Sequence, residues 1–275
     1  MNAAEPTSMD RRDYPRNPSG LPDASGSEAP ATDQEFDLAY ARSPEELDEI
    51  QRLRYTVFNL ELNEGLDESH ITGRDSDDFD PYCHHVYVRH RASGTIAGTY
   101  RMQTIEMARD GIGLYSATEF DFGTMPDEIL DEAVEIGRAC IRREFRSLKV
   151  LYMLWKGLGR YVGHNRKSFV FGCCSLTSQD QNEGAAVYRQ LERDGHLHES
   201  IRVEPLLSHA CLMDPDADFE VEKVSPPRLM RAYLSFGARI CSPPAIDRQF
   251  KTIDFLAVFD TESLEATNLA FYRIT

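Results

Sequence analysis

Apolar residues recur at helical spacing in two long parts of the chain. The first follows Ser43, where a serine cap, a proline and two glutamates are typical of a helix start. The second follows Ser147 and runs to about Gly163. Shorter helices are predicted at about 181–194 and 227–236. The two long helices carry the apolar stripes Leu47, Ile50, Leu53, Val57 and Phe58, and Leu151, Leu154, Trp155, Leu158 and Val162.

Other stretches have the composition of β-strands. Residues 168–176 are apolar without interruption, as in a strand that is covered on both faces. Residues 92–94 lie between two such stretches and predict a hairpin turn. This order of elements predicts an α/β fold with one central, mostly antiparallel sheet flanked by helices. The predicted strands are 35–41, 84–90, 95–102, 133–143, 168–176 and 252–260.

The N-terminal residues 1–35 differ in composition from the rest. They hold five prolines, four serines and seven acids, while Leu21 and Tyr14 are their only larger aliphatic and aromatic residues. Such a segment buries too little apolar surface to offset the entropy of ordering it, so we predict a disordered tail. Residues 36–275 are predicted to form a single domain. Within it, the polar residues 59–82 predict a long loop of the kind that often carries function.

The charge of the chain restricts its partners. It has 30 bases and 46 acids, a net charge of −16, and a sequence pI near 4.9. A surface this acidic repels phosphates, which excludes a broad nucleic-acid or anionic-membrane interface. The six cysteines show no CxxC spacing and no histidines at zinc-finger intervals, so no metal site is predicted. Neither a signal peptide nor a membrane span is visible, which favours a reducing, cytoplasmic setting.

One segment is an exception to the acidic balance. Residues 138–167 contain nine bases and one acid, a net charge of +8, which leaves −24 on the rest of the chain. The run is compatible with a solvated helix face and a few ion pairs. It is also compatible with a docking point for a phosphate or an acidic protein, because Arg142, Arg143 and Arg146 precede a helix N-terminus.

Familiar catalytic motifs are absent. The sequence has no GxSxG, HExxH, P-loop or GxGxxG pattern. Cys83, His84 and His85 are adjacent, but neighbouring strand residues point to opposite faces, so the two histidines are poorly placed to share an ion.

Charged residues inside strands are the stronger signal. Arg101, Glu135 and Arg138 occupy positions where a buried strand is normally apolar, and burying a charge is costly unless it is paired. One explanation is a structural ion pair between Glu135 and an arginine. The other is a carboxylate base in a cleft, with arginines that hold an anionic substrate. In a regular strand Glu135 and Arg138 face opposite sides, so their cooperation requires a β-bulge at Gly137.

Several stretches together resemble the GNAT-fold N-acyltransferases of the ornithine-lipid synthase type, a bacterial lipid-biosynthesis family often labelled hemolysin-like. More distantly, the chain is similar to N-acyl amino acid synthases and acyl-homoserine-lactone synthases. The resemblance covers residues 36–262 and implies a GNAT-like fold in which the strands near 135–141 and 168–175 splay apart around the acyl-phosphopantetheine arm. The stretches are LRYTVF (53–58), DDFDPYCHHVYV (77–88), GTYRM (98–102), EIGRACIRREFRS (135–147) and CSPPAIDRQFKTIDFLAVFD (241–260).

The resemblance also implies roles for residues that bind the amine substrate. Arg54 and Phe58 would belong to a mobile N-terminal lid over the site. Asp77 and Asp80 would be the paired acids that hold Arg54 and contact the amine, and Arg101 would complete this charged group from its strand.

Catalysis is assigned by the same resemblance. Glu135 would assist deprotonation of the attacking amine, through water, with Arg138 as its ion partner. Asp247, Lys251 and Asp254 match the family pattern but receive no role.

The loop before the second long helix departs from ordinary acetyl-CoA GNATs. Those carry a glycine-rich loop for the CoA pyrophosphate, whereas residues 142–148 contain no glycine. An acyl carrier protein, which presents one phosphate on an acidic protein, fits the +8 segment better, although CoA remains an alternative donor. No permanently bound cofactor is expected, and the docking residues are predicted to be Arg142, Arg143, Arg146 and Lys149.

The expected activity is therefore transfer of a long-chain fatty acyl group, with or without a 3-hydroxyl, from an acyl carrier protein to the α-amine of an amino acid. Two alternatives stay open: an acyl-homoserine-lactone-type signal synthase, and a non-catalytic module that binds acyl carrier protein. Peripheral contact with the inner face of the membrane is a secondary expectation, because the product is an amphiphile.

Overall fold

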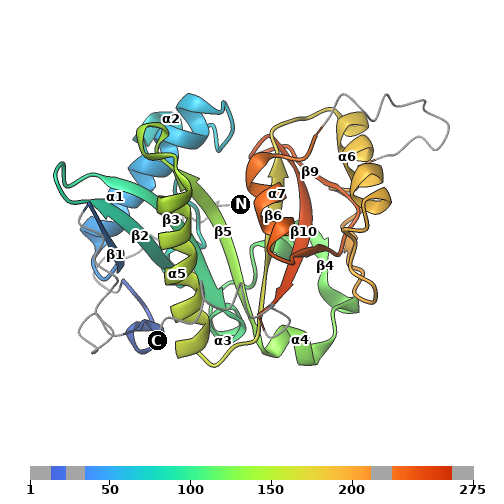
Figure 1. Cartoon of the computed structure of the whole chain (residues 1–275), viewed down its shortest axis with the longest axis horizontal. Helices are drawn as coiled ribbons and strands as arrows, with labels where there is room; N and C mark the ends of the chain where they lie inside the picture. Colours follow the sequence, from blue (N-terminus) through green and yellow to red (C-terminus); the bar gives the residue numbers. More distant parts are fainter. Residues whose placement is uncertain (1–13, 23–34, 212–224, 262–275) are drawn as a thin grey trace, which may run out of the picture.

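The computed structural model describes residues 14–22, 35–211 and 225–261 of the chain. These residues fold around one mixed sheet in the order β1-β2-β3-β5-β6-β10-β8, with β9 beside β10 (Figure 1). All its pairings are antiparallel except that of β5 with β6, which confirms the predicted fold class. Its strands are β1 (Phe36–Tyr40), β2 (His84–His90), β3 (Ile96–Thr104), β5 (Ala133–Ile141), β6 (Phe169–Leu176), β8 (Arg239–Ile240), β9 (Ala245–Asp247) and β10 (Thr252–Asp260).

The helices and a small second sheet cover both faces of this sheet. The second sheet pairs β4 (Phe120–Asp121) with β7 (Glu204–Pro205). The helices are α1 (Pro44–Tyr55), α2 (Ser69–Thr72), α3 (Ile105–Asp110), α4 (Asp127–Asp131), α5 (Leu148–His164), α6 (Gln181–Arg193) and α7 (Arg228–Ser235). The bounds of α1, α5, α6 and α7 agree with the four helices predicted from the sequence, whereas α2, α3 and α4 were not predicted.

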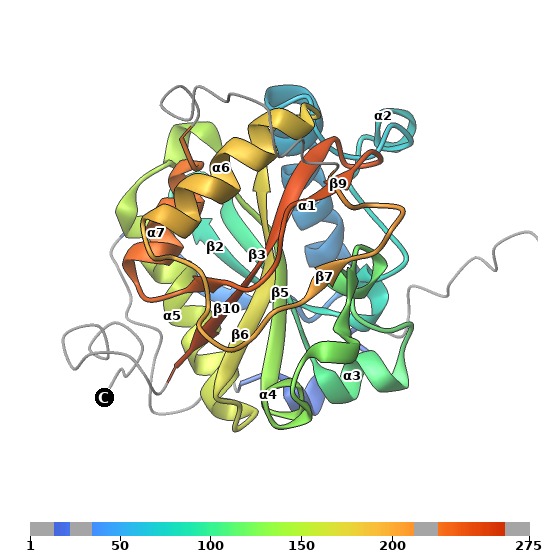
Figure 2. The ribbon, with the colours of Figure 1, turned by 90° about the vertical axis from the view of Figure 1, so that its right-hand side faces the viewer.

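The two long helices pack on opposite faces of one half of the sheet. The apolar stripe of α5 contacts Val86 and Tyr100, whereas α1 packs with Tyr87, the neighbour of Val86 on the other side of β2, and with Ile96, which lies beyond a register shift in β3. In the other half, α6 and α7 lie on one side of β10 and β6, and α3 and α4 lie toward the other side (Figure 2). We call the side of the sheet that carries α1 and α3 the α1 face.

Two segments differ from their sequence predictions. Residues 59–82 are not a plain loop: α1 continues as a π-helical segment, η3 (Thr56–Glu61), and α2 and the short 3₁₀ turn η4 (Asp80–Tyr82) follow. The described part of the predicted tail, 14–22, packs on the domain. Leu21 is buried in the core, and the Tyr14 hydroxyl lies 2.9 Å from Nδ1 of His85. The two apolar residues of the tail are thus its anchors; residues 1–13 and 23–34 lie outside the described residues.

None of the helices in the described ranges is both long enough and apolar enough to cross a membrane.

Candidate active site

The parallel strands β5 and β6 pair over three residues and then separate. Their register runs only from Ala133–Phe169 to Glu135–Phe171, and Figure 1 shows the two strands diverging from their lower ends. At the point of divergence, a β-carbon on Gly172 would lie 2.1 Å from the carbonyl oxygen of Ile136, so this close approach requires glycine. This is the splayed strand pair that the resemblance implied.

A cavity of about 700 Å³ occupies the space between the separated strands. Apolar side chains of α5 and α7, such as Leu151, Trp155 and Met230, line one part of it. Glu135, Arg138 and Arg101 line another part. The cavity therefore combines an apolar region with a charged end, as a site for an amphiphilic substrate requires.

A β-bulge in β5 aims Arg138 at this charged end. Opposite the two-residue step from Thr99 to Arg101, β5 advances three residues, from Gly137 to Cys140. The predicted bulge is confirmed, but Arg138 rather than Gly137 has the positive φ, of 49°. A non-glycine residue in this region is uncommon and needs compensation. The guanidinium supplies it by stacking over the rings of Phe250 and Tyr115, at 4.2 and 4.7 Å from their centroids.

Three arginines and three aspartates form a buried group that we call the arginine-aspartate cluster. Arg54, which has no exposed surface, donates to Asp75 at 2.7 Å and to Asp80 at 2.8 Å. Arg101 pairs with both Asp77, at 2.6 Å, and Asp80, at 3.0 Å. Arg138 completes the cluster with a 2.9 Å contact to Asp77 and a 3.5 Å contact to Asp75.

The cluster corrects one predicted pairing. The resemblance implied that Asp77 and Asp80 hold Arg54, but Asp77 binds Arg101 and Arg138, and the second partner of Arg54 is Asp75. Sequence reasoning missed Asp75. Its only signal was its place two residues before the Asp77-x-x-Asp80 pair in a polar stretch.

Electrostatics keep the cluster ionised. Burial alone would raise the pKa of Asp80, but Arg54, His85 and Arg101 hold it well below its usual range. In the same way, Arg101 and Arg138 lower the pKa of Asp77 despite its burial. The three positive and three negative charges therefore compensate one another inside the protein.

Glu135 is fixed by hydrogen bonds instead of an ion pair. Its Oε2 accepts from the Gln103 side chain at 2.6 Å and from the Tyr115 backbone N–H at 3.0 Å. Its Oε1 accepts from both the backbone N–H and the hydroxyl of Ser116, each at 2.7 Å. The expected ion pair with Arg138 is not formed, because the bulge turns that side chain toward the aspartates.

Phe58 lies in η3 and lines the cavity, where it packs edge-on against Phe250 with ring centroids 5.2 Å apart. Arg54 lies one turn earlier, at the end of α1. The lid role of these two residues stays a prediction.

The predicted docking residues surround the N-terminus of α5. Ser147 caps this helix, and its hydroxyl accepts from the Val150 N–H at 3.3 Å. Arg143 is exposed and has no ion-pair partner among the described residues. The other three residues face acids of their own chain: Arg142 faces Glu144, Arg146 binds Glu61, and Lys149 lies 2.8 Å from Glu35.

A second buried polar group lies nearby on the α1 face; the sequence reasoning named its members Asp247 and Asp254 without a role and missed Glu64 and Glu119. We call Glu64, Glu119, Asp247 and Asp254 the acid cluster. In the parts of the chain that the structure describes, no lysine or arginine forms an ion pair with any of the four. Burial and the neighbouring aspartates raise the pKa of Glu119 to about 10, and burial raises that of Asp254 to about 6 and that of Glu64 to about 7.

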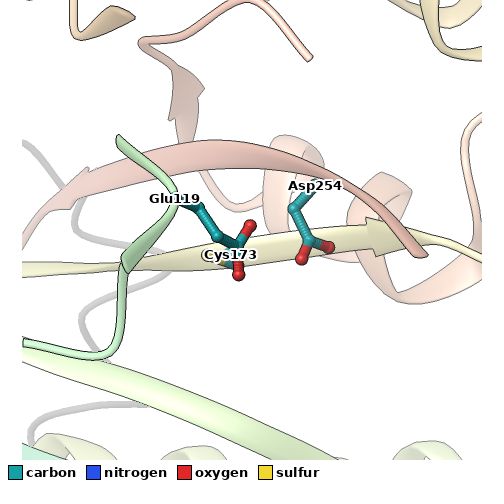
Figure 3. A group of neighbouring side chains, drawn as sticks. All are labelled: Glu119, Cys173 and Asp254. Carbon is teal, nitrogen blue, oxygen red and sulfur yellow. The ribbon is translucent and has the colours of Figure 1, made fainter. Parts of the chain in front are cut away.

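Glu119 and Asp254 approach the Cys173 thiol (Figure 3). One potential ligand atom from each residue lies within 4.8 Å of the other two, a group that could hold a cation. The prediction of no metal site considered only cysteine and histidine spacing, so it did not test this group. By contrast, His84 and His85 bind different partners, Tyr161 and Asp80, as expected for neighbouring strand residues.

Comparisons with known proteins give consistent results. A GNAT acetyltransferase domain model matches residues 53–156. The chain is 29% identical over 244 residues to an L-ornithine N(alpha)-acyltransferase of Agrobacterium fabrum, covering 84% of this chain and 83% of that protein. It is 28% identical over 260 residues to the protein of the same name from Rhizobium meliloti, covering 89% and 88%.

Among solved structures, the comparison finds the AHL synthase LasI, with a TM-score of 0.46 at 12% identity over 86% of this chain and 93% of that one. FeeM, an N-acyl amino acid synthase from uncultured soil microbes, has a TM-score of 0.46 at 10% identity over 83% and 92%.

Proposed function

We propose that this chain, a GNAT acyltransferase related to the L-ornithine N(alpha)-acyltransferases, transfers a long-chain fatty acyl group from an acyl-carrier-protein thioester to the α-amine of an amino acid. The product would be an N-acyl amino acid of the kind that leads to an ornithine lipid. The observation that carries the proposal is the Glu135 carboxylate, fixed by four hydrogen bonds at the cavity between the separated strands.

The chemistry begins with a proton transfer. An α-amine with a pKa of about 8 is mostly protonated at neutral pH and cannot attack. Glu135 takes one proton from the ammonium, directly or through one water. The nitrogen lone pair then forms a bond to the thioester carbonyl carbon, the C–S bond breaks, and the departing thiolate takes the second proton lost by the nitrogen. A positioned base of this kind contributes about 10²- to 10⁴-fold in rate.

The separated strands supply the second catalytic element. Beyond Glu135 and Phe171 the β5–β6 ladder ends, which leaves backbone groups on the facing edges available to a substrate. A backbone N–H of this edge can donate to the tetrahedral oxyanion. We assign the acceptor carboxylate to Arg101 and Arg138, the two cluster arginines that line the cavity.

The donor would dock at the N-terminus of α5. Exposed ion pairs such as Arg146 with Glu61 contribute at most about 1 kcal/mol, so acids of a carrier protein can replace them. The triple variant Arg142→Glu, Arg143→Glu, Arg146→Glu should raise KM for an acyl carrier donor at least tenfold more than for acyl-CoA. An equal rise in KM for both donors would show that these three arginines do not recognise the carrier protein.

Membrane contact would involve exposed apolar residues at the cavity. Leu148, 64% exposed, and Leu62, 36% exposed, both line it, and Leu60 lies beside Leu62. Replacing Leu60, Leu62 and Leu148 with serine should reduce binding to zwitterionic liposomes in a flotation assay. Wild-type protein that does not float with liposomes would rule out this contact.

The proposed reaction is tested with purified protein, a 3-hydroxypalmitoyl carrier protein and ornithine, by mass spectrometry of the amide product. Glu135→Gln should lower kcat by about 10²- to 10⁴-fold without loss of the folded state. Glu132→Gln, the same change at an exposed position nearby, is the matched control. An unchanged kcat in Glu135→Gln would remove Glu135 from the mechanism. Release of methylthioadenosine from S-adenosylmethionine would instead identify a signal synthase.

A further inference from the structure

The acid cluster is a buried group of carboxylates, none of which forms an ion pair with a lysine or arginine of the described ranges. Glu64, Glu119 and Asp254 are 5%, 1% and 3% exposed. Asp247 is satisfied by backbone N–H groups of Gln249 and Phe250 and by the Tyr115 hydroxyl. The other three differ, because carboxylates buried at this depth normally have a base or several donors.

Two of these side chains leave oxygens unused. Within the described residues, no donor other than the proton that Glu119 and Asp254 can share reaches either carboxylate oxygen of Glu119 or Oδ1 of Asp254. A proton shared between the two carboxyl groups relieves their repulsion but leaves one negative charge on the pair. Buried carboxylate oxygens that carry negative charge and lack a donor can bind a cation that donates hydrogen bonds, such as an ammonium group.

The cluster opens onto the same cavity as Glu135. Glu64, Cys173 and Asp254 all line it. Glu135 pairs with Phe171 of β6 and Asp254 pairs with Ser175. Every second residue of a strand points to the same face, so residues 171, 173 and 175 of β6 share one face. The carboxylates of Glu135 and Asp254, which pair with the first and last of these residues, therefore both lie on the α1 face of the sheet.

Short contacts connect the two positions. The Ser116 hydroxyl lies 2.7 Å from Oε1 of Glu135 and 3.6 Å from Sγ of Cys173. The Cys173 sulfur in turn lies within 4.8 Å of a carboxylate oxygen of Asp254. An extended amino acid with an amine at the end of three or four methylenes separates its two nitrogens by about 6–7 Å. Such a molecule can place its α-amine toward Glu135 and its second amine toward Asp254.

We propose that Glu64, Glu119 and Asp254 bind the side-chain ammonium of a diamino acid acceptor and thereby select basic amino acids for acylation. This inference rests on the proposed acyltransfer to an α-amine. The N–H donors of the ammonium meet the unused oxygens of Glu119 and Asp254, and Glu64 lines the same cavity. The Arg101 and Arg138 guanidinium groups, which line the same cavity, receive the acceptor carboxylate.

A metal ion fits this position less well. The group offers only two carboxylates and one thiol, whereas Ca²⁺ takes about six to eight oxygen ligands. The position also opens into a cavity large enough for an organic substrate.

Binding without donor is the first test. Calorimetry should show that ornithine binds the wild-type protein at least tenfold more tightly than norvaline, its neutral counterpart of equal chain length. Asp254→Asn and Glu119→Gln should each weaken ornithine binding at least tenfold and change norvaline binding less than twofold. Asp127→Asn, an exposed position on α4, is the matched control. Equal binding of the two amino acids by wild type, or equal losses in the variants, would overturn the proposal.

Turnover separates this inference from the proposed function. If ornithine binds and the variants release it but no amide forms with any donor, the cation site stands and the acyltransfer fails. If amides form with ornithine and norvaline at equal kcat/KM, the acyltransfer stands and the cation site fails. One divalent ion per purified chain, lost in Glu119→Gln, would also overturn the site, since the metal would occupy the ammonium position.

Discussion

The two buried polar clusters on the α1 face solve the problem of buried charge differently. In the arginine-aspartate cluster, three guanidinium groups face three carboxylates, and every charge has a partner of opposite sign. In the acid cluster, four carboxylates lie together and none of them is ion-paired with a base of the described residues. Glu135, on the same face of the sheet, is hydrogen-bonded to Ser116 and Gln103.

This difference separates a scaffold from a binding site. A compensated cluster is complete without substrate, so it can fix the positions of Arg101 and Arg138 at the cavity. An uncompensated cluster lowers the stability of the empty protein and recovers free energy when a cation arrives. The comparison therefore predicts opposite effects of neutralising one charge in each group.

The largest effect should come from Arg54→Met, which keeps the side-chain volume but removes one charge from the balanced cluster. Asp75 and Asp80 would then be buried without their main partner, and breaking a buried pair in this way costs about 3–5 kcal/mol. The free energy of unfolding, measured by urea titration, should fall by that amount. Arg52→Met on the same helix breaks an exposed pair with Asp48 and should cost less than about 1 kcal/mol. Equal losses of unfolding free energy in the two variants would show that the buried ion pairs stabilise the fold no more than an exposed pair does.

The next effect concerns pH. The carboxyl pKa of Glu64 is about 7 in the folded protein, above its unfolded value of about 4.3, so between these values the folded state binds more protons. Its stabilising contribution is complete below pH 4 and is lost as the pH rises through 7. The stabilising contribution of Asp254, whose pKa is raised to about 6, is likewise lost as the pH rises through 6. The lowered pKa values of Asp77 and Asp80 act in the opposite sense, and their contribution is lost only as the pH falls below about 4.

Glu64→Gln should therefore flatten the decline in unfolding free energy between pH 5 and pH 8. The change amounts to at most about 3 kcal/mol, at about 1.4 kcal/mol per unit of pKa. Urea titrations at four pH values would measure it, with Glu132→Gln as the exposed control. If the unfolding free energy of Glu64→Gln and wild type depended on pH in the same way, burial would not raise the pKa of Glu64 in the folded protein.

The sequence predicted the regular parts of this architecture well and its irregular parts poorly. Periodic apolar positions located the long helices and the strands, and Gly137 next to two charges indicated the bulge. Residues 59–82 hold eight acids, and only the path of the chain decides that Asp75 and Asp80 turn inward. The same applies to Glu119, in a segment for which no element was predicted. Asp254 did carry a signal, a charge in an apolar strand, which is the feature that singled out Glu135.

The smallest effect should come from Ser116→Ala, which acts between the two clusters. The change removes one of four hydrogen bonds to Glu135 and the contact with Cys173. Loss of one such bond costs about 1 kcal/mol, which corresponds to a roughly fivefold to tenfold lower kcat when it loosens the base. KM for ornithine should stay unchanged, because Ser116 touches neither the ammonium nor the carboxylate position, and Ser116→Thr should restore part of kcat. A raised KM for ornithine with kcat intact would show instead that Ser116 belongs to the acid cluster, and that the two clusters act on the substrate as one network.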